Sequence, residues 1–132
     1  FYAAIGPQGG TLHWMVTEKM NTENMSVFLK RVAEAHIDRH VVMVVDGASS
    51  HRATALEVPD NMSLIRLPPY SPELNPTEIL WHGLREKRCA NRVFESLDAV
   101  CSEVLVGLQE FASHSKAVTR LSGWPWIINS IV

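Results

Sequence analysis

The sequence predicts an α/β domain in which a mixed sheet is flanked by helices. Strand-like segments alternate with segments that carry apolar residues at helical spacing, and a short Gly-rich loop joins the first two strand-like segments. A strand–helix–strand crossover follows this hairpin, and such crossovers place parallel strands in one sheet. With 132 residues the chain can bury one core, so we expect a single domain over residues 1–132.

The chain opens on a predicted hairpin. The segments Phe1–Ile5 and Thr11–Val16 are rich in aromatic and β-favouring residues, and a five-residue loop, GPQGG, separates them. Apolar residues then recur at three- and four-residue steps, which predicts a helix that begins at Asn21 or Thr22 and ends near His36. Its expected buried stripe consists of Met25, Phe28, Leu29 and Val32.

Five consecutive apolar residues, Val41–Val45, predict the next strand. Four of them are valines, and such a run is typical of a central parallel strand that is buried on both faces. The strand ends at Asp46. We expect a short helical piece around Arg52–Leu56 and a further strand at about Met62–Leu67.

Helices predominate in the last third of the sequence. Prolines exclude regular structure over Pro68–Pro72, and a helix is predicted from Pro76, which suits a first-turn position, to about Arg88. Ser96 is expected to cap another helix, and a short one is predicted near Lys116–Leu121. The helix after Ser96 carries a continuous apolar stripe of Leu97, Val100, Cys101, Val104, Leu105, Leu108 and Phe111.

The composition is that of an ordinary folded domain, with 46% apolar and 20% charged residues, and it excludes wholesale disorder. The formal net charge is −2, which is the wrong sign for a domain that holds DNA by itself. A role with nucleic acid must therefore depend on a local patch, on a metal ion or on a separate basic domain.

Two cysteines, Cys89 and Cys101, form neither a disulfide framework nor a metal-ligand pattern, so we expect a reduced, cytoplasmic setting. The apolar runs are too short to span a bilayer, and no membrane association is expected. The chain has no initiator Met and opens directly in a strand-like segment at Phe1. We therefore expect that it is an N-terminally truncated part of a longer protein.

Two acidic residues stand where chemistry is expected. Asp46 follows the most apolar strand, and ligands gather at the carboxyl ends of strands in open α/β sheets. Asp46 also begins a good turn sequence, DGAS, so a structural role remains open. Glu78 falls in the first turn of the helix from Pro76, where the helix dipole stabilises any carboxylate, and that is its simpler interpretation.

Taken together, these two acids come from separate elements and have the oxygen ligands that Mg²⁺ and Mn²⁺ prefer. Two such metal ions about 4 Å apart can activate the attacking oxygen and stabilise the leaving oxygen in phosphodiester chemistry.

Basic residues follow Glu78 on the same helix. Trp81, His82 and Arg85 lie three, four and seven residues on, hence on the same helical face. His82 and Arg85 are candidates for contact with DNA phosphates, or they belong to a solvated polar face. The basic cluster is a candidate DNA-contacting patch, or the basic end that the helix dipole favours. Its members are Arg85, Lys87, Arg88 and Arg92.

Two segments carry a resemblance to a known family. Val44–His51 reads VVDGASSH, and Leu67–Glu78 reads LPPYSPELNPTE. Together they resemble the signature of mariner-like DDE transposases, in their bacterial insertion-sequence branch. The 31 residues between Asp46 and Glu78 (positions 47 to 77) match the thirty-odd usual in that family. Trp81 and the closing Trp126-Ile127 also fit, whereas Gly47 stands where the family commonly has Asn.

The resemblance implies a ribonuclease H-like fold that lacks its first strand. It implies that Asp46 and Glu78 are the second and third catalytic acids and the ligands of Mg²⁺ or Mn²⁺. His51 matches a recurrent family histidine that orients a phosphate or a catalytic carboxylate, unless it is a surface or capping residue. The first acid is expected upstream of Phe1. Asp38 and Asp60 do not replace it, because neither lies on a strand that precedes the hairpin.

The leading hypothesis is therefore a DNA transposase catalytic domain. In the parent protein it would cleave phosphodiesters and transfer strands during DNA integration and recombination. Its partners would be double-stranded DNA, both transposon ends and target, and a second copy in a homodimer. Helix-turn-helix modules upstream would recognise the DNA.

The alternative is a non-catalytic remnant or fragment that folds and self-associates. A third possibility, a phosphatase or nucleotide-binding module, is disfavoured because the sequence has no Walker-type loop, Asp-x-Asp pair or nucleophile elbow.

Overall fold

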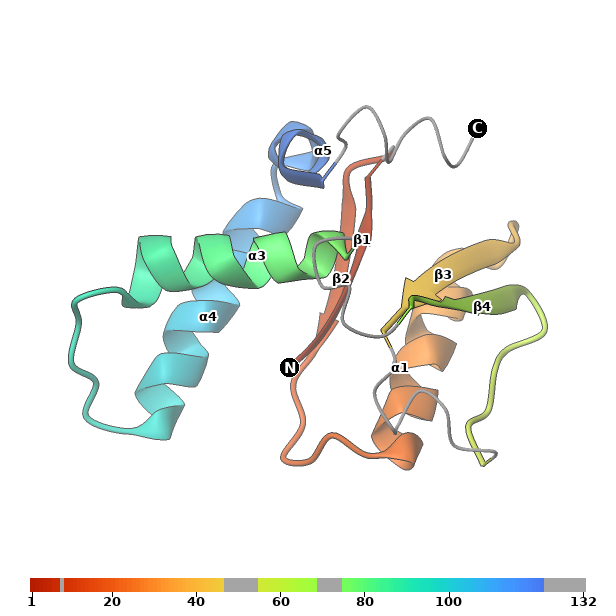
Figure 1. Cartoon of the computed structure of the whole chain (residues 1–132), viewed down its shortest axis with the longest axis horizontal. Coiled ribbons are helices and arrows are strands. Elements are labelled where there is room, and N and C mark those ends of the chain that lie inside the picture. Colours follow the sequence, from red (N-terminus) through yellow and green to blue (C-terminus); the bar gives the residue numbers. More distant parts are fainter. Residues whose placement is uncertain (8, 47–54, 69–74, 123–132) are drawn as a thin grey trace. The chain divides into compact units, whose positions relative to one another are not determined.

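The structure, a computed structural model, describes residues 1–7, 9–46, 55–68 and 75–122. The chain divides into two units, each with its own packing. The first unit comprises Phe1–Tyr2 and Trp14–Asn75, and the second comprises Ala3–His13 and Pro76–Val132. Small sheets and helices make up both, which confirms the predicted α/β class (Figure 1).

The predicted hairpin is present. Strands β1 (Tyr2–Gly6) and β2 (Thr11–Met15) pair in a two-stranded sheet. The amide of Gly10 donates to the carbonyl of Gly6 over 2.8 Å and closes the loop. Gly10 has φ +66°, and a Cβ there would collide with the backbone oxygen of Ser115. The position therefore requires glycine for its conformation and for its close approach to the chain.

Helix α1 (Thr22–Ala35) begins and buries its residues as predicted. Asn21 caps it, because the Asn21 side chain accepts a hydrogen bond from the amide of Asn24 over 2.8 Å. The stripe is buried, and the ring of Tyr2 stacks on Phe28 with 5.5 Å between centroids. The Tyr2 hydroxyl donates to the carbonyl of Asn21 over 3.2 Å. Burial raises the pKa of this phenol above its ordinary value, and the hydrogen bond to Asn21 partly offsets the effect.

Strands β3 (Val41–Val45) and β4 (Met62–Arg66) pair in parallel, with Val44 opposite Ile65. The prediction that β3 is buried on both faces is wrong. Met43 and Val45 are buried, but Val42 is 58% exposed and Val44 is 45% exposed. Side chains alternate between the faces of a strand, and within the described residues only one face of this sheet is covered.

A single amide joins the end of α1 to the start of β4. The side chain of Asn61 donates to the carbonyls of Ala33, His36 and Arg39, at 3.0, 3.2 and 3.3 Å. These carbonyls lie at and beyond the C-terminus of the helix, where backbone acceptors lack helical partners. Asn61 therefore holds the helix beside the parallel strand pair.

The second unit contains the predicted helices. They are α3 (Pro76–Leu84), a π-helical turn η2 (Arg85–Cys89), α4 (Leu97–Ala112) and α5 (Ser115–Ser122). Ser96 caps α4 by accepting from the amide of Ala99 over 3.1 Å, as expected. Leu80, Leu84, Leu108 and Val118 are almost fully buried and form the core of this unit. The expected stripe on α4 is less covered than predicted, since Leu97 is 78% exposed.

The described strands form two small sheets, β1–β2 and β3–β4, rather than one continuous mixed sheet. The short helical piece expected at Arg52–Leu56 lies largely outside the described residues, and Ala55 lies in a turn. Most of the proline-rich run and the aromatic end of the chain also lie outside them. Among the described helices, none is both long and apolar enough to cross a membrane.

Candidate functional site

Asp46 lies where the carboxyl ends of two parallel strands meet. It is exposed and follows Val45, the last residue of β3, directly. Val45 pairs in register with Arg66, and the amide of Leu67 donates to the carbonyl of Val45 over 2.8 Å. The backbone ladder is thus intact up to the residue before Asp46. A parallel ladder of this kind presents a carboxylate at the edge of the sheet where ligands bind.

Glu78 is the third residue of α3 and is exposed. Buried Leu80 and Leu84 fix the opposite side of this helix in the core of the second unit. The first-turn position places the carboxylate near the positive end of the helix dipole. Glu78 therefore lies in the first turn of a well-packed helix, as the sequence predicted, and its side chain is exposed.

These two acids belong to different units, Asp46 to the first and Glu78 to the second. That they converge on one cation stays a prediction. His51 and Gly47 lie outside the described residues.

As metal ligands, the two side chains have suitable chemistry. Both offer carboxylate oxygens, which Mg²⁺ and Mn²⁺ prefer, and both are exposed at the end of a regular element. Over the described ranges, no group of three or more His, Cys, Asp or Glu side chains is close enough to hold an ion. Asp38 is 79% exposed and lies 4.0 Å from Arg39, so it is a surface residue. Each of the two carboxylates therefore has the chemistry of a divalent-metal ligand, and their joint binding of one ion stays a prediction.

The basic residues after Glu78 divide into two groups. His82 and Arg85 are exposed, and neither is in an ion pair within the part of the chain that the structure describes. Lys87, Arg88 and Arg92 instead form ion pairs with two glutamates of α4. The structure therefore leaves His82 and Arg85 more available to an external anion than the other three.

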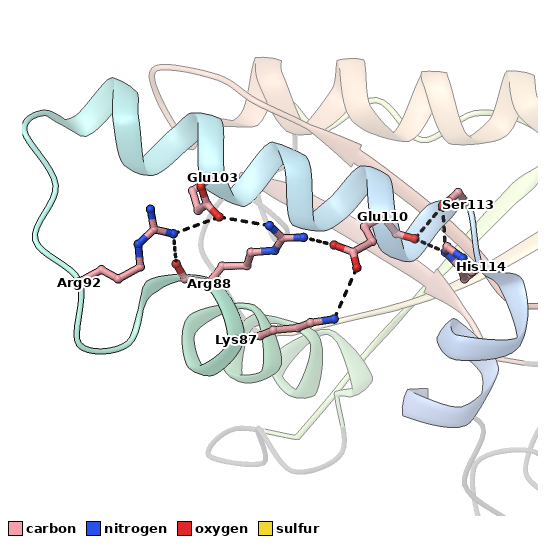
Figure 2. A network of polar contacts seen from close by, with 7 residues as sticks. All are labelled: Lys87, Arg88, Arg92, Glu103, Glu110, Ser113 and His114. Carbon is pink, nitrogen blue, oxygen red and sulfur yellow. Dashed lines mark hydrogen bonds and ion pairs between the residues drawn. The ribbon is translucent and has the colours of Figure 1, made fainter.

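Figure 2 shows the charged network that joins η2 and the loop after it to α4. Arg88 donates through Nη1 to Glu103 Oε1 over 3.2 Å and through Nη2 to Glu110 Oε2. Arg92 Nη1 lies 3.1 Å from the same oxygen of Glu103, and Lys87 Nζ lies 3.6 Å from Glu110 Oε1. Three cations thus converge on two carboxylates.

Sequence reasoning missed Glu103 and Glu110. They are seven residues apart, which is two helical turns, so they lie on the same face of α4. This spacing, together with the basic run before α4, was the available signal. Arg88 donates a hydrogen bond to Glu103 and, with Arg92 adding to the effect, lowers the pKa of that carboxyl below its ordinary value.

The class of protein follows from the architecture together with a family model. A mixed α/β arrangement of small sheets and helices, with one carboxylate after a parallel strand and another in the first turn of a later helix, is compatible with a fragment of a ribonuclease H-like domain. A family model described as "DDE superfamily endonuclease" matches residues 1–101, and the chain belongs to this family.

The chain is also similar to a bacterial protein over nearly its whole length. The chain is 33% identical over 131 residues to "Uncharacterized protein y4pE/y4sA" of Sinorhizobium fredii (strain NBRC 101917 / NGR234), covering 98% of this chain and 90% of the relative. No solved structure matches the chain. Membership of the family supports a transposase-like nuclease function in general, with DNA as the substrate, and DDE endonucleases generally use divalent metal ions.

Proposed function

We propose that the chain is the catalytic domain of a mariner-like DDE transposase of the bacterial insertion-sequence branch. The observation that carries the proposal is the pair of acids in their motifs. Asp46 directly follows a parallel strand, within VVDGASSH, and Glu78 is the third residue of a helix, directly after LPPYSPELNPT. The parent protein would cleave DNA and transfer strands between transposon ends and a double-stranded target.

In this mechanism, Asp46 and Glu78 are the second and third acids of the family triad and hold Mg²⁺ or Mn²⁺. The ions, when bound, activate the attacking oxygen and stabilise the leaving one. The attacking oxygen belongs to water or to a DNA 3′ end. The protein contributes by positioning: Asp46 is fixed by the β3–β4 ladder, and Glu78 by the packing of α3.

Five residues are candidates for contact with DNA: His51, His82, Arg85, Lys87 and Arg88. We assign phosphate contact first to His82 and Arg85, which are exposed on the helix that carries Glu78. Lys87 and Arg88 share their charge with Glu103 and Glu110, so their contribution is smaller. Because the net charge of −2 has the wrong sign for neutralising phosphates, most of the DNA affinity would come from other modules of the parent protein.

Metal binding tests the proposed site directly. Titration of the chain with Mn²⁺, followed by electron paramagnetic resonance, should reveal a site that Asp46→Asn and Glu78→Gln each weaken at least about tenfold. Asp38→Asn, which removes an exposed acid outside the motifs, is the matched control and should bind as the unaltered chain does. Mn²⁺ binding that ignores Asp46 and Glu78 would contradict the proposal.

A second candidate function is that of a non-catalytic fragment that folds and self-associates. The observation in its favour is the exposed apolar face of the β3–β4 pair, formed by Val42, Val44 and Ile65. The chain matches two of the three family acids. We therefore expect no appreciable cleavage of duplex DNA by this polypeptide with Mg²⁺ or Mn²⁺. Robust cleavage that Asp46→Ala abolishes would show that another acid of this chain completes the site.

A further inference from the structure

Glu78 lies near one end of a continuous helical segment, and Arg88 lies near the other. Helix α3 passes into η2 without a break, since Leu84 at the junction keeps helical angles of φ −65° and ψ −42°. The two residues are ten positions apart, or roughly 15 Å along the axis at the helical rise. A segment of this length is marginal in isolation, so its direction depends on what it packs against.

Helix α4 packs closely against the far end of this segment. A Cβ built on Gly107 would lie 2.5 Å from Leu84 Cδ2 and 3.6 Å from Arg88 Cγ. Leu84 and Leu108 are both almost fully buried. Because glycine has no side chain, the backbone of α4 at position 107 can lie directly against Leu84 and Arg88.

Arg88 joins the α3–η2 segment to α4 through two carboxylates. Its two Nη atoms bind Glu103 and Glu110, so one planar guanidinium joins two side chains whose backbone positions are roughly 10 Å apart along α4. Its side chain is only 23% exposed, compared with 62% for Lys87 and 51% for Arg92. Arg88 Nε is buried and has no hydrogen-bond partner among the described residues, so the group is directed into the interface and away from solvent.

We propose that Arg88 is a positioning residue for Glu78: it holds the α3–η2 segment against α4 and so fixes the direction in which the Glu78 carboxylate points. The inference rests on the proposed function for the role of Glu78, but not for the role of Arg88 itself. Lys87 and Arg92 are secondary ties to the same two glutamates. Arg85, on the same segment, remains turned to solvent and available to DNA.

A purely local salt bridge predicts something different. Ion pairs at the surface contribute little to the stability of a fold, and their loss alters only the nearby residues. A positioning role instead predicts an effect at the turn of Glu78, ten residues away. The two explanations therefore differ in where the loss of Arg88 is felt.

Hydrogen exchange on the 132-residue chain separates them. In Arg88→Met, which keeps an apolar stem, the amides of Leu80–Leu84 should exchange about tenfold faster, while those of Phe28–Val32 in α1 stay unchanged. Arg88→Lys, which keeps the charge without the planar fork, should give the same change to a smaller degree. Arg120→Gln, an exposed arginine on α5, is the control and should change nothing in α3. Faster exchange confined to residues 85–92 would overturn the proposal.

Electron paramagnetic resonance of bound Mn²⁺ gives a second measurement, which should not change if Arg88 only stabilises the fold. If Arg88 positions Glu78, Arg88→Met should weaken Mn²⁺ binding several-fold and broaden its spectrum, and Arg88→Lys should restore part of both. Unaltered Mn²⁺ binding in Arg88→Met, with α3 loosened, would also overturn the proposal. If Glu78→Gln bound Mn²⁺ as the native chain does, the proposed function would be contradicted. Hydrogen exchange at Leu80–Leu84 alone would then decide whether Arg88 holds the α3–η2 segment.

Discussion

The two units of the chain secure their helices by different means. In the first unit a neutral amide, Asn61, satisfies three carbonyls at and beyond the end of α1, and a second amide, Asn21, caps its start. In the second unit three cations, two in η2 and Arg92 in the loop after it, pair with two carboxylates of α4. Neutral hydrogen bonds are insensitive to pH and salt, whereas ion pairs respond to both. The comparison teaches that the helix carrying Glu78 is the one whose support depends on charge.

The largest expected effects concern the apolar core that each unit has. Leu29 in α1 and Leu108 in α4 are both 0% exposed, so they form a matched pair across the units. Each change, Leu29→Ala or Leu108→Ala, should lower the free energy of unfolding by about 2–5 kcal/mol, measured in urea. A loss below about 1 kcal/mol at either site would show that the unit concerned lacks a packed core.

The next prediction concerns the close approach of α4 to the α3–η2 segment. Gly107→Ala forces a methyl group against Leu84 and should destabilise the chain by about 1–3 kcal/mol. Gly83 is the matched control: it is also helical, but a Cβ there meets nothing within 4 Å. Gly83→Ala should stabilise by up to about 1 kcal/mol, because alanine favours the helix. Equal effects at the two glycines would show that α4 yields readily and that the contact is not tight.

Local patterns predicted the elements better than their surroundings. The caps at Asn21 and Ser96 were predictable because a side-chain oxygen at that position binds an amide two or three residues on, whatever the tertiary fold. The exposure of Val42 and Val44 was not, because an apolar run specifies a strand without specifying how many faces are covered.

The candidate site shows the same division. Asp46 and Glu78 were predictable from motif and position, and both occupy the element ends expected of them. The bonding of Arg88 was not, because a basic run looks alike whether it faces DNA or a glutamate. Glu103 lies fifteen residues further along the chain, and only tertiary packing brings the two side chains together.

Self-association tests another feature of the first unit, the exposed apolar face of its β3–β4 sheet. The described strands β3 and β4 form a two-stranded sheet, and Val44 on its uncovered face is 45% exposed. Such strands invite pairing with another chain, so we expect a dimer in sedimentation experiments. Val44→Lys should weaken it by about tenfold, roughly 1.4 kcal/mol. Val27→Lys, on α1 with 44% exposure, is the control and should leave it unchanged. A monomer at high concentration would contradict this expectation.

The smallest expected effect is the pH response of the charged network. The pKa of Glu103 is lowered in the folded chain because Arg88 donates a hydrogen bond to it, with Arg92 contributing. A lowered folded-state pKa means that the unfolded chain binds the proton more readily. The stabilisation is therefore complete above the ordinary pKa of a glutamate and is lost as the pH falls through the lowered value. As the pH falls below the ordinary pKa of a glutamate, the native chain should lose more stability than Glu103→Gln does.

Thermal unfolding at a series of pH values measures this difference, and Glu95→Gln is the control. Glu95 is an exposed acid in the loop before α4, and its replacement should leave the native pH profile unchanged. Because Glu103 lies at a partly exposed surface, high salt should also reduce its contribution, by screening the cations beside it. The first unit offers an internal comparison. The side-chain amide of Asn61 does not titrate in this pH range, so its hydrogen bonds should not respond to acidification. If Glu103→Gln and the native chain lost stability in parallel on acidification, the network would not support α4, and the contrast between the two units would rest on packing alone.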